Sequence, residues 1–287
     1  MESRGLGDVY KRQAIGMAMA MNIPLLFFLG KIEANRWLRW GMQVMALASV
    51  PAIIGTYSRG AWLGLVMAIL LIVWQSRYRF VMAAMIVPIA IGAIAYAPDR
   101  VFSRFDELVN YEEDGSAQQR IWSWRFARKV FAANPVTGAG FEYYGMEATG
   151  KYYPELWQRW PGRYWSAHST WFAILSEHGL LGTITWFGLL LVAIRNALYL
   201  RRVGKQDRAP PWAGPVAKML LGAMGAFIVC GTFYDAAYFD LYYEFVALTI
   251  IATSLLRRRM TELSEASTAD ASSYDRAGST LAPSSVR

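Results

Sequence analysis

The chain has 287 residues, of which 55% are hydrophobic and 17% are charged, and its formal net charge is +8. Because a soluble domain carries roughly 25% charged residues, this composition excludes an ordinary soluble globular protein. The single cysteine, Cys230, excludes a disulfide framework and a cysteine-based metal site within the chain. We interpret Cys230 as a small packing residue.

The apolar residues are concentrated in blocks that short charged strips separate. Blocks of about 15–25 apolar residues are typical of transmembrane helices. The composition therefore predicts an all-α integral membrane protein. The positive charge lies mostly in the strips beside the blocks, which indicates anchoring at a membrane surface and argues against nucleic acid as a partner.

Residues 1–13 differ from the apolar block that follows them. Their basic pair, Lys11-Arg12, leads into a segment without the small-residue cleavage site of a signal peptide. We therefore expect residues 1–13 to be a non-native segment at the start of a truncated chain.

About seven transmembrane helices follow from the apolar blocks. They are expected at residues 14–30, 40–57, 61–75, 80–97, 169–194, 216–234 and 241–256. Basic strips lie between the first and second spans, between the third and fourth, between the fifth and sixth, and after the seventh. The positive-inside rule places all four strips in the cytoplasm, and seven alternating spans are consistent with that placement.

The remaining connections then face outward: the turn 58–60, the long segment 98–168 and the turn 235–240. The chain is therefore expected to consist of four helices in 14–97, a large periplasmic loop in 98–168 and three helices in 169–256. A tail rich in Ser, Ala and Thr follows at 257–287, and we expect it to be disordered and cytoplasmic.

Residues 117–133 of the large loop are expected to form an amphipathic helix. A capping-box pattern begins at Ser116, and Asn134-Pro135 supplies a stop. On a helical wheel a basic stripe of Arg125, Arg128 and Lys129 runs beside two apolar faces. Such a helix is expected to lie in the membrane interface.

Two arginines on the outer side are candidates for binding an anion. Arg120 lies outside the basic stripe, in the expected first turn, where free N–H groups and the helix dipole favour anions and a guanidinium can bind phosphate through two hydrogen bonds. Alternatively, Arg120 snorkels to the interface or pairs with an acidic residue of the run 112–114. Arg59 lies in the turn 58–60, where a positive charge opposes the orientation rule, and its alternative is to snorkel to the interface.

Candidate proton-transfer groups lie where the loop meets the fifth span. His168 could act as a general base near neutral pH, or it could be an ordinary interfacial histidine. Glu177 and His178 fall roughly 15 Å into that span at about 1.5 Å per residue, and ionisable groups at such depth are functional candidates. The alternatives are a pair between helices, or a span that begins near Gly179.

Two further features are weaker. Asp235, Asp240 and Glu244 form an outward acidic cluster that could position arginines. The turn Gly138-Ala139-Gly140 could cradle a phosphate, but glycine after Asn-Pro is commonly only a turn.

The order of these motifs resembles a known family. The motifs are Ser58-Arg59-Gly60-Ala61, Arg120 with Trp124, Asn134-Pro135-Val136-Thr137-Gly138-Ala139-Gly140-Phe141, Ala167-His168-Ser169 and Glu177-His178-Gly179-Leu180-Leu181-Gly182. Together they are similar to the O-antigen ligase and polymerase superfamily of bacterial envelope glycosyltransferases, over about residues 14–256. The Glu-His-Gly form is similar to the O-glycosylation ligases associated with exosortase systems. Family members usually have more spans, so we expect that N-terminal helices are missing from this chain. They also usually have an Asn where Ser169 stands.

The resemblance implies a ligase-type glycosyltransferase of the bacterial inner membrane, of the kind that serves lipopolysaccharide biosynthesis. It would move a glycan from an undecaprenyl-pyrophosphate carrier to a lipid, protein or glycan acceptor at the periplasmic face, among membrane lipids. His168 would be the catalytic base, and Arg59 and Arg120 would hold the pyrophosphate. Arg125 and Glu177 are counted with them as substrate-binding residues.

No metal or other cofactor is expected, because fixed arginines can stabilise the departing diphosphate. The three residues Arg59, Arg120 and His168 are expected to surround one outward cavity, with functional groups within about 15 Å and an apolar side opening. Two alternatives stay open. One is a lipid-linked glycan flippase or transporter, which requires polar or broken spans around a midplane cavity; the other is a non-catalytic envelope assembly protein.

Overall fold

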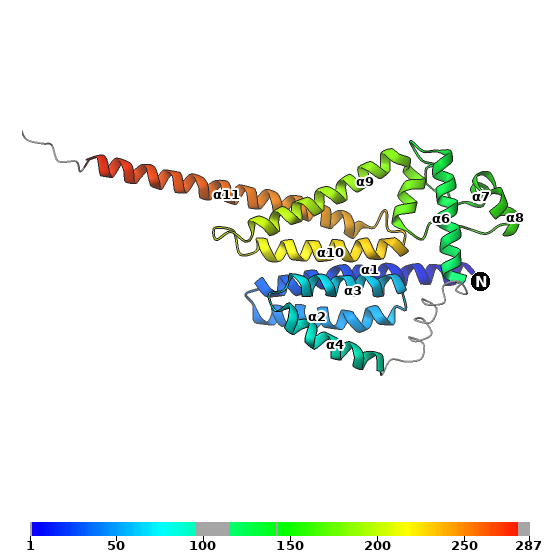
Figure 1. The fold of residues 1–287 in the computed structure, drawn as a ribbon, viewed down its shortest axis with the longest axis horizontal. Helices are drawn as coiled ribbons and strands as arrows, with labels where there is room; N and C mark the ends of the chain where they lie inside the picture. Colours follow the sequence, from blue (N-terminus) through cyan, green and yellow to red (C-terminus); the bar gives the residue numbers. More distant parts are fainter. Residues whose placement is uncertain (1, 96–114, 142, 281–287) are drawn as a thin grey trace, which may run out of the picture.

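The computed structural model describes residues 2–95, 115–141 and 143–280, and in this part of the chain every regular element is a helix (Figure 1). The helices are α1 Glu2–Ile32, α2 Arg36–Gly55, α3 Arg59–Gln75, α4 Arg79–Ala95, α6 Gly115–Ala133, α7 Met146–Tyr152, α8 Pro154–Arg159, α9 Thr170–Val203, α10 Ala213–Phe233 and α11 Asp240–Thr280. The predicted all-α membrane class is confirmed.

Each of the seven predicted spans coincides largely with a helix. Four helical segments are long and apolar enough to cross a membrane, namely Lys11–Ile32, Arg36–Gly55, Thr170–Val203 and Ala213–Phe233. Two further helical segments, Arg59–Gln75 and Arg79–Pro88, are apolar but shorter. The protein is therefore embedded in a membrane by several apolar helices.

The core of the bundle forms where α1, α3 and α10 run side by side (Figure 1). Small residues allow their backbones to approach closely, as is common between membrane helices. Gly64 of α3 faces Cys230 and Ala226 of α10, and Gly222 of α10 faces Pro24 of α1. Cys230 is 1% exposed, as its interpretation as a packing residue requires.

The connections predicted to face outward share one end of the bundle. There α3 begins, α10 ends, and α6, α7 and α8 form a cap (Figure 1). The turns that carry the basic strips lie at the opposite end. This separation agrees with the alternation of the predicted spans.

The cap has a hydrophobic core of its own. Its buried residues are Phe126, Ala127, Val130, Tyr143, Leu156, Trp165, Ala167 and Ala173. The helix α6 runs crosswise at the end of the bundle (Figure 1), and Arg125, Arg128 and Lys129 are exposed as the helical wheel predicts. Its apolar faces, however, pack on protein, because α7, α8 and the start of α9 cover them.

The bounds of α6 differ slightly from the prediction. It ends at Ala133, directly before Asn134-Pro135, as expected, but it begins at Gly115. Arg120 therefore lies in the second turn, where backbone amides already bond within the helix, and the helix N-terminus does not contribute an anion site there. The acidic residues 112–114, the alternative partners of Arg120, lie outside the described residues.

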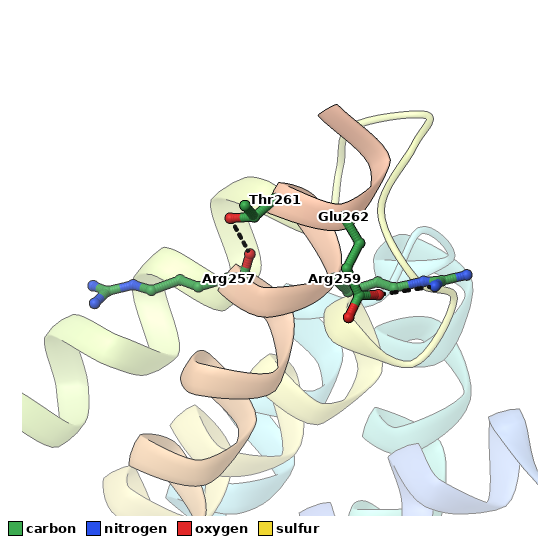
Figure 2. A network of polar contacts seen from close by, with 4 residues as sticks. All are labelled: Arg257, Arg259, Thr261 and Glu262. Atoms are coloured by element: carbon green, nitrogen blue, oxygen red, sulfur yellow. Dashed lines mark hydrogen bonds and ion pairs between the residues drawn. The ribbon is translucent and has the colours of Figure 1, made fainter. Parts of the chain in front are cut away.

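The described chain is helical at both ends. The helix α11 continues to Thr280, into the tail expected to be disordered, and local contacts support its first turn beyond the apolar part. Arg259 Nη1 lies 3.1 Å from Glu262 Oε2, and Thr261 Oγ1 donates to the Arg257 carbonyl at 3.1 Å (Figure 2). Likewise α1 runs without a break from Glu2 into the first span.

Candidate active site

The helix α9 is broken at Gly179. This residue has φ 60° and ψ −156°, a conformation that only glycine adopts readily. Figure 1 shows the first part of α9 beside the cap and the longer part turning along the bundle. The estimated depth of about 15 Å for Glu177 and His178 assumed a straight helix, so the break supports the alternative that the straight span begins near Gly179.

Four backbone hydrogen bonds hold the break against the turn 134–140. Ala139 and Gly140 donate to the carbonyls of Ser176 and Glu177, each at 2.9 Å. In return, Leu180 and Leu181 donate to the carbonyls of Pro135 and Val136, at 2.8 and 3.2 Å. The freed groups of the broken helix are thus satisfied, as a membrane protein requires.

This pairing explains the glycine turn. Gly138 has φ 73°, and a side chain there would meet the backbone of Glu177. The amides of Ala139 and Gly140, which a phosphate loop would use, are already bonded to α9. The turn supports the site and does not cradle a phosphate.

Glu177 is buried at the break, with 2% of its surface exposed. Tyr238 donates a hydrogen bond from its hydroxyl to Glu177 Oε2, and the same hydroxyl lies 2.6 Å from His178 Nε2. Phe141 packs against both rings, and its ring centroid lies 5.3 Å from that of His178 and 5.5 Å from that of Tyr238. One tyrosine hydroxyl therefore links the two ionisable residues that the sequence singled out.

A cavity of about 410 Å³ opens beside Glu177. It lies between the start of α9, the cap and the turn that follows α10. Its lining residues are Tyr144, Tyr164, Ser166, Glu177, Tyr234, Asp235, Ala236, Tyr238 and Phe239. Burial raises the pKa of Asp235 to about 6 and that of Tyr144 to about 12. Of the predicted acidic cluster, only Asp235 lines the cavity, whereas Asp240 and Glu244 are exposed on α11.

His168 and Arg120 lie close together next to this cavity. Burial, together with the positive charge of Arg120, lowers the pKa of His168 to about 4. The guanidinium carbon of Arg120 lies 6.0 Å from the ring centroid of Phe233, the last residue of α10. His168 is therefore a neutral imidazole at pH 7, with a cation at its side.

The start of α3 packs against the same phenylalanine. The Ser58 hydroxyl caps this helix by accepting from the Ala61 amide at 3.3 Å. Gly60 is buried so closely that a Cβ atom there would lie 3.2 Å from Phe233 Cβ. Arg59 therefore begins its helix beside the residue that Arg120 covers. The structure gathers the segments of Arg59, Arg120 and His168 around Phe233.

His168 has an unusual backbone conformation. Its φ is 47°, in the left-handed region that few residues other than glycine occupy. The chain is held immediately afterwards, because Thr170 donates from its backbone N–H and its hydroxyl to the Tyr234 carbonyl, at 3.0 and 2.9 Å. The Ala236 amide returns a bond to the Thr170 hydroxyl at 3.0 Å. These bonds join the histidine segment to the turn that carries Asp235.

Arg125 does not join this group. It is exposed, and its guanidinium carbon stacks 4.8 Å above the ring of Trp122. Arg159 of α8 lies above the neighbouring Trp160 at 4.6 Å. Arg125 thus belongs to an outer surface of the cap, away from the buried face of α6.

The four tyrosines of the cavity are the residues that sequence reasoning missed. They come from two loops and no shared motif, so only their abundance near predicted outward turns signals them. No group of three His, Cys, Asp or Glu side chains suited to a metal ion occurs in the part of the chain that the structure describes.

The structure defines an all-helical membrane protein with a folded cap, an arginine–histidine cluster and an adjoining polar cavity. Residues 44–187, half of the chain, match the family model described as O-antigen ligase. The chain therefore belongs to the O-antigen ligase family, whose role is the assembly of envelope glycans by a membrane glycosyltransferase or ligase. The matched range includes most of α2, all of α3 and α6, and the break in α9. No curated protein matches the chain.

Proposed function

We propose that this protein transfers a glycan from an undecaprenyl-pyrophosphate carrier to an acceptor at the periplasmic face of the bacterial inner membrane. The acceptor is a lipid core, a protein or another glycan. The observation that supports this proposal is the proximity of Arg120 to His168 around Phe233, where the helix that begins at Arg59 also packs. The Glu177-His178-Gly179 sequence suggests the exosortase-associated branch of the family.

The arginines would bind the diphosphate. As the bond between the anomeric carbon and the diphosphate oxygen breaks, its electron pair moves onto that oxygen, and negative charge develops there. Guanidinium groups held in place before the reaction stabilise this charge in the transition state. Arg59 and Arg120 can each donate two hydrogen bonds to phosphate oxygens.

His168 would accept the proton of the acceptor. The acceptor oxygen or nitrogen forms the new bond to the anomeric carbon, and its proton passes to the neutral imidazole. The pKa of His168 is low in the unliganded protein because of burial and the charge of Arg120. A bound diphosphate would offset that positive charge, and so raise the pKa of His168 and strengthen the base when substrate is present.

The test is a transfer assay with the full-length protein in lipid nanodiscs. Lipid-linked glycan and acceptor are supplied, and the glycosylated acceptor and released polyprenyl diphosphate are measured. We expect His168→Ala and Arg120→Ala each to reduce the rate by about 100-fold or more, the usual size of general-base and charge-stabilisation effects.

The matched control is Arg128→Ala, which removes an exposed arginine from the same helix. It is expected to transfer at the wild-type rate. Unimpaired transfer by correctly folded His168→Ala and Arg120→Ala proteins would overturn the proposal and favour a non-catalytic assembly role.

A further inference from the structure

We infer that the cavity beside Glu177 is a sugar-binding subsite, and that it selects a sugar residue that is uncharged or carries an amine over an acidic one. This inference rests on the proposed function for the identity of the glycan as substrate. It adds the chemical class of the sugar, which neither the family nor the motifs indicate.

The size and lining of the cavity suit a sugar. Its volume of about 410 Å³ lies within the range of small-molecule sites, about 300–1,000 Å³. Four of its nine lining residues are tyrosines, whose rings offer apolar faces and whose hydroxyls can donate and accept hydrogen bonds. Tyr164 and Tyr238 are about half exposed, so they lie at the rim, whereas Glu177 and Ser166 are buried.

The charge of the cavity sets its selectivity. Glu177 and Asp235 line it, and none of its lining residues is a lysine or an arginine. Ionised carboxylates only accept hydrogen bonds, and sugar hydroxyls or an ammonium group are the donors that complement them. A carboxylate or phosphate on the ligand would instead meet the negative charge of Asp235 in a partly desolvated place.

Asp235 in particular lacks strong partners for a carboxylate held out of water. Its hydrogen bond within the described part of the chain comes from the Ala237 amide at 3.5 Å. The raised pKa of Asp235 has the same cause, because the bond from the Ala237 amide offsets the effect of burial only in part. A ligand hydroxyl or amine bound there would supply the missing donor.

The position of the cavity connects it to the reacting groups. Ser166 lines it and stands two residues before His168, while Asp235 stands two residues after Phe233, the ring that Arg120 covers. The bonds from Thr170 to Tyr234 and Ala236 hold these two segments together. A sugar in the cavity would therefore sit beside the arginine–histidine cluster, with cationic groups toward the diphosphate and anionic groups toward the sugar.

A binding experiment tests the inference without requiring transfer. The full-length protein in labelled nanodiscs is applied to an array of neutral, amino and uronic-acid-containing oligosaccharides, and empty nanodiscs define the background. We expect binding to neutral or amino oligosaccharides and at least about tenfold weaker binding to acidic ones. Asp235→Asn should reduce this preference at least about fivefold, and Tyr164→Ala should weaken binding by about tenfold.

Matched controls come from the opposite end of the bundle. Asp207→Asn and Tyr78→Ala remove an exposed aspartate and an exposed tyrosine there, and both should bind as the wild type does. The inference is overturned by a preference for acidic oligosaccharides, by unchanged binding in both cavity variants, or by the absence of oligosaccharide binding to the wild type.

Transfer kinetics then identify the source of the sugar. An increase in KM for the lipid-linked donor in Asp235→Asn assigns the subsite to the donor glycan, and an increase in KM for the acceptor assigns it to the acceptor. The two proposals fail separately. Oligosaccharide binding together with normal transfer by His168→Ala overturns the proposed function alone, whereas loss of transfer in His168→Ala without oligosaccharide binding overturns the subsite alone.

Discussion

At the scale of single residues, the state of His168 matters most for the proposed chemistry. An unperturbed histidine is about half protonated near pH 6.5, and in that state it could not serve fully as a base. Burial and Arg120 lower the pKa of His168 to about 4, so the imidazole is neutral through the physiological range. The left-handed backbone conformation of His168 lowers the stability of the folded protein, and the hydrogen bonds of Thr170 hold the chain in that conformation.

Titration of the two histidines by NMR tests this state directly, because a chain with only two histidines gives resolvable ring signals. We expect the His168 signal to stay that of the neutral ring on acidification until about pH 4. Arg120→Gln should raise the pKa of His168, because it removes a positive charge that disfavours the imidazolium. The value should stay below 6.5, since burial is the larger cause.

Arg128→Gln is the control for this titration, because its charge lies on the exposed face of α6. It should leave the His168 titration unchanged. A wild-type His168 that protonates near pH 6.5, or one that is indifferent to Arg120→Gln, would refute the electrostatic coupling.

At the scale of elements, the break in α9 is the feature that builds the site. A continuous helix would have carried Glu177 into the bundle, whereas the break leaves it beside the cap, in contact with Tyr238. The break is stable because the turn 134–140 supplies partners for the freed carbonyls and amides. Two motifs that lie far apart in sequence, the glycine turn and Glu177-His178-Gly179, thus form one structural unit.

Two alanine substitutions separate the contributions of this turn. Gly138 and Gly140 both have positive φ, 73° and 82°, but a side chain at Gly138 would meet the Glu177 backbone, and one at Gly140 would meet nothing within 4 Å. Gly140→Ala should therefore cost only the left-handed strain, about 1–2 kcal/mol. Gly138→Ala should cost clearly more, because the turn must move away from α9.

Thermal unfolding in detergent or nanodiscs measures this difference as the lowering of Tm relative to wild type. Gly138→Ala should also reduce transfer, because Glu177 and the cavity shift with the turn, while Gly140→Ala should transfer nearly normally. Equal losses of Tm in the two variants would show that Gly138 does not pack closely against the backbone of α9 at Glu177.

At the scale of the whole molecule, the two ends of the bundle differ in charge and in the size of their connecting segments. One end holds the cap, the cavity and the arginine–histidine cluster, and the other holds short turns with the basic strips. The positive-inside rule assigns the basic end to the cytoplasm. The candidate site would then face the periplasm, as the proposed function requires.

Cysteine labelling in intact cells tests this orientation. In a Cys230→Ala background, which removes the single buried cysteine, Phe141→Cys and Tyr78→Cys place a thiol at exposed positions on opposite ends. A membrane-impermeant maleimide that reaches the periplasm should label position 141 in intact cells. Position 78 should be labelled only after the inner membrane is permeabilised, and the reverse pattern would place the site on the cytoplasmic side.

The location of the helices and the identity of the membrane class follow from sequence alone. Apolar blocks long enough to span a bilayer predict helices whatever their neighbours are, because the backbone must satisfy its hydrogen bonds within each segment. The stop at Asn134-Pro135, the exposed stripe of Arg125, Arg128 and Lys129, and the buried Cys230 were predictable for the same reason. Each depends on local chain chemistry or on a periodicity that one helix carries by itself.

The site was decided only by tertiary structure. Whether Glu177 lies deep in a span or beside the cap depends on Gly179 meeting the turn 134–140, a contact between distant segments that periodicity cannot show. The tyrosines gather around Asp235 because α9, the cap and the turn after α10 converge there, and Arg125 is separated from Arg120 because they occupy different faces of α6. Local sequence sets which segments become helices, since that depends on hydrogen bonds and burial within a segment. Which charges share a cavity depends on long-range packing, and that information is spread over the whole chain.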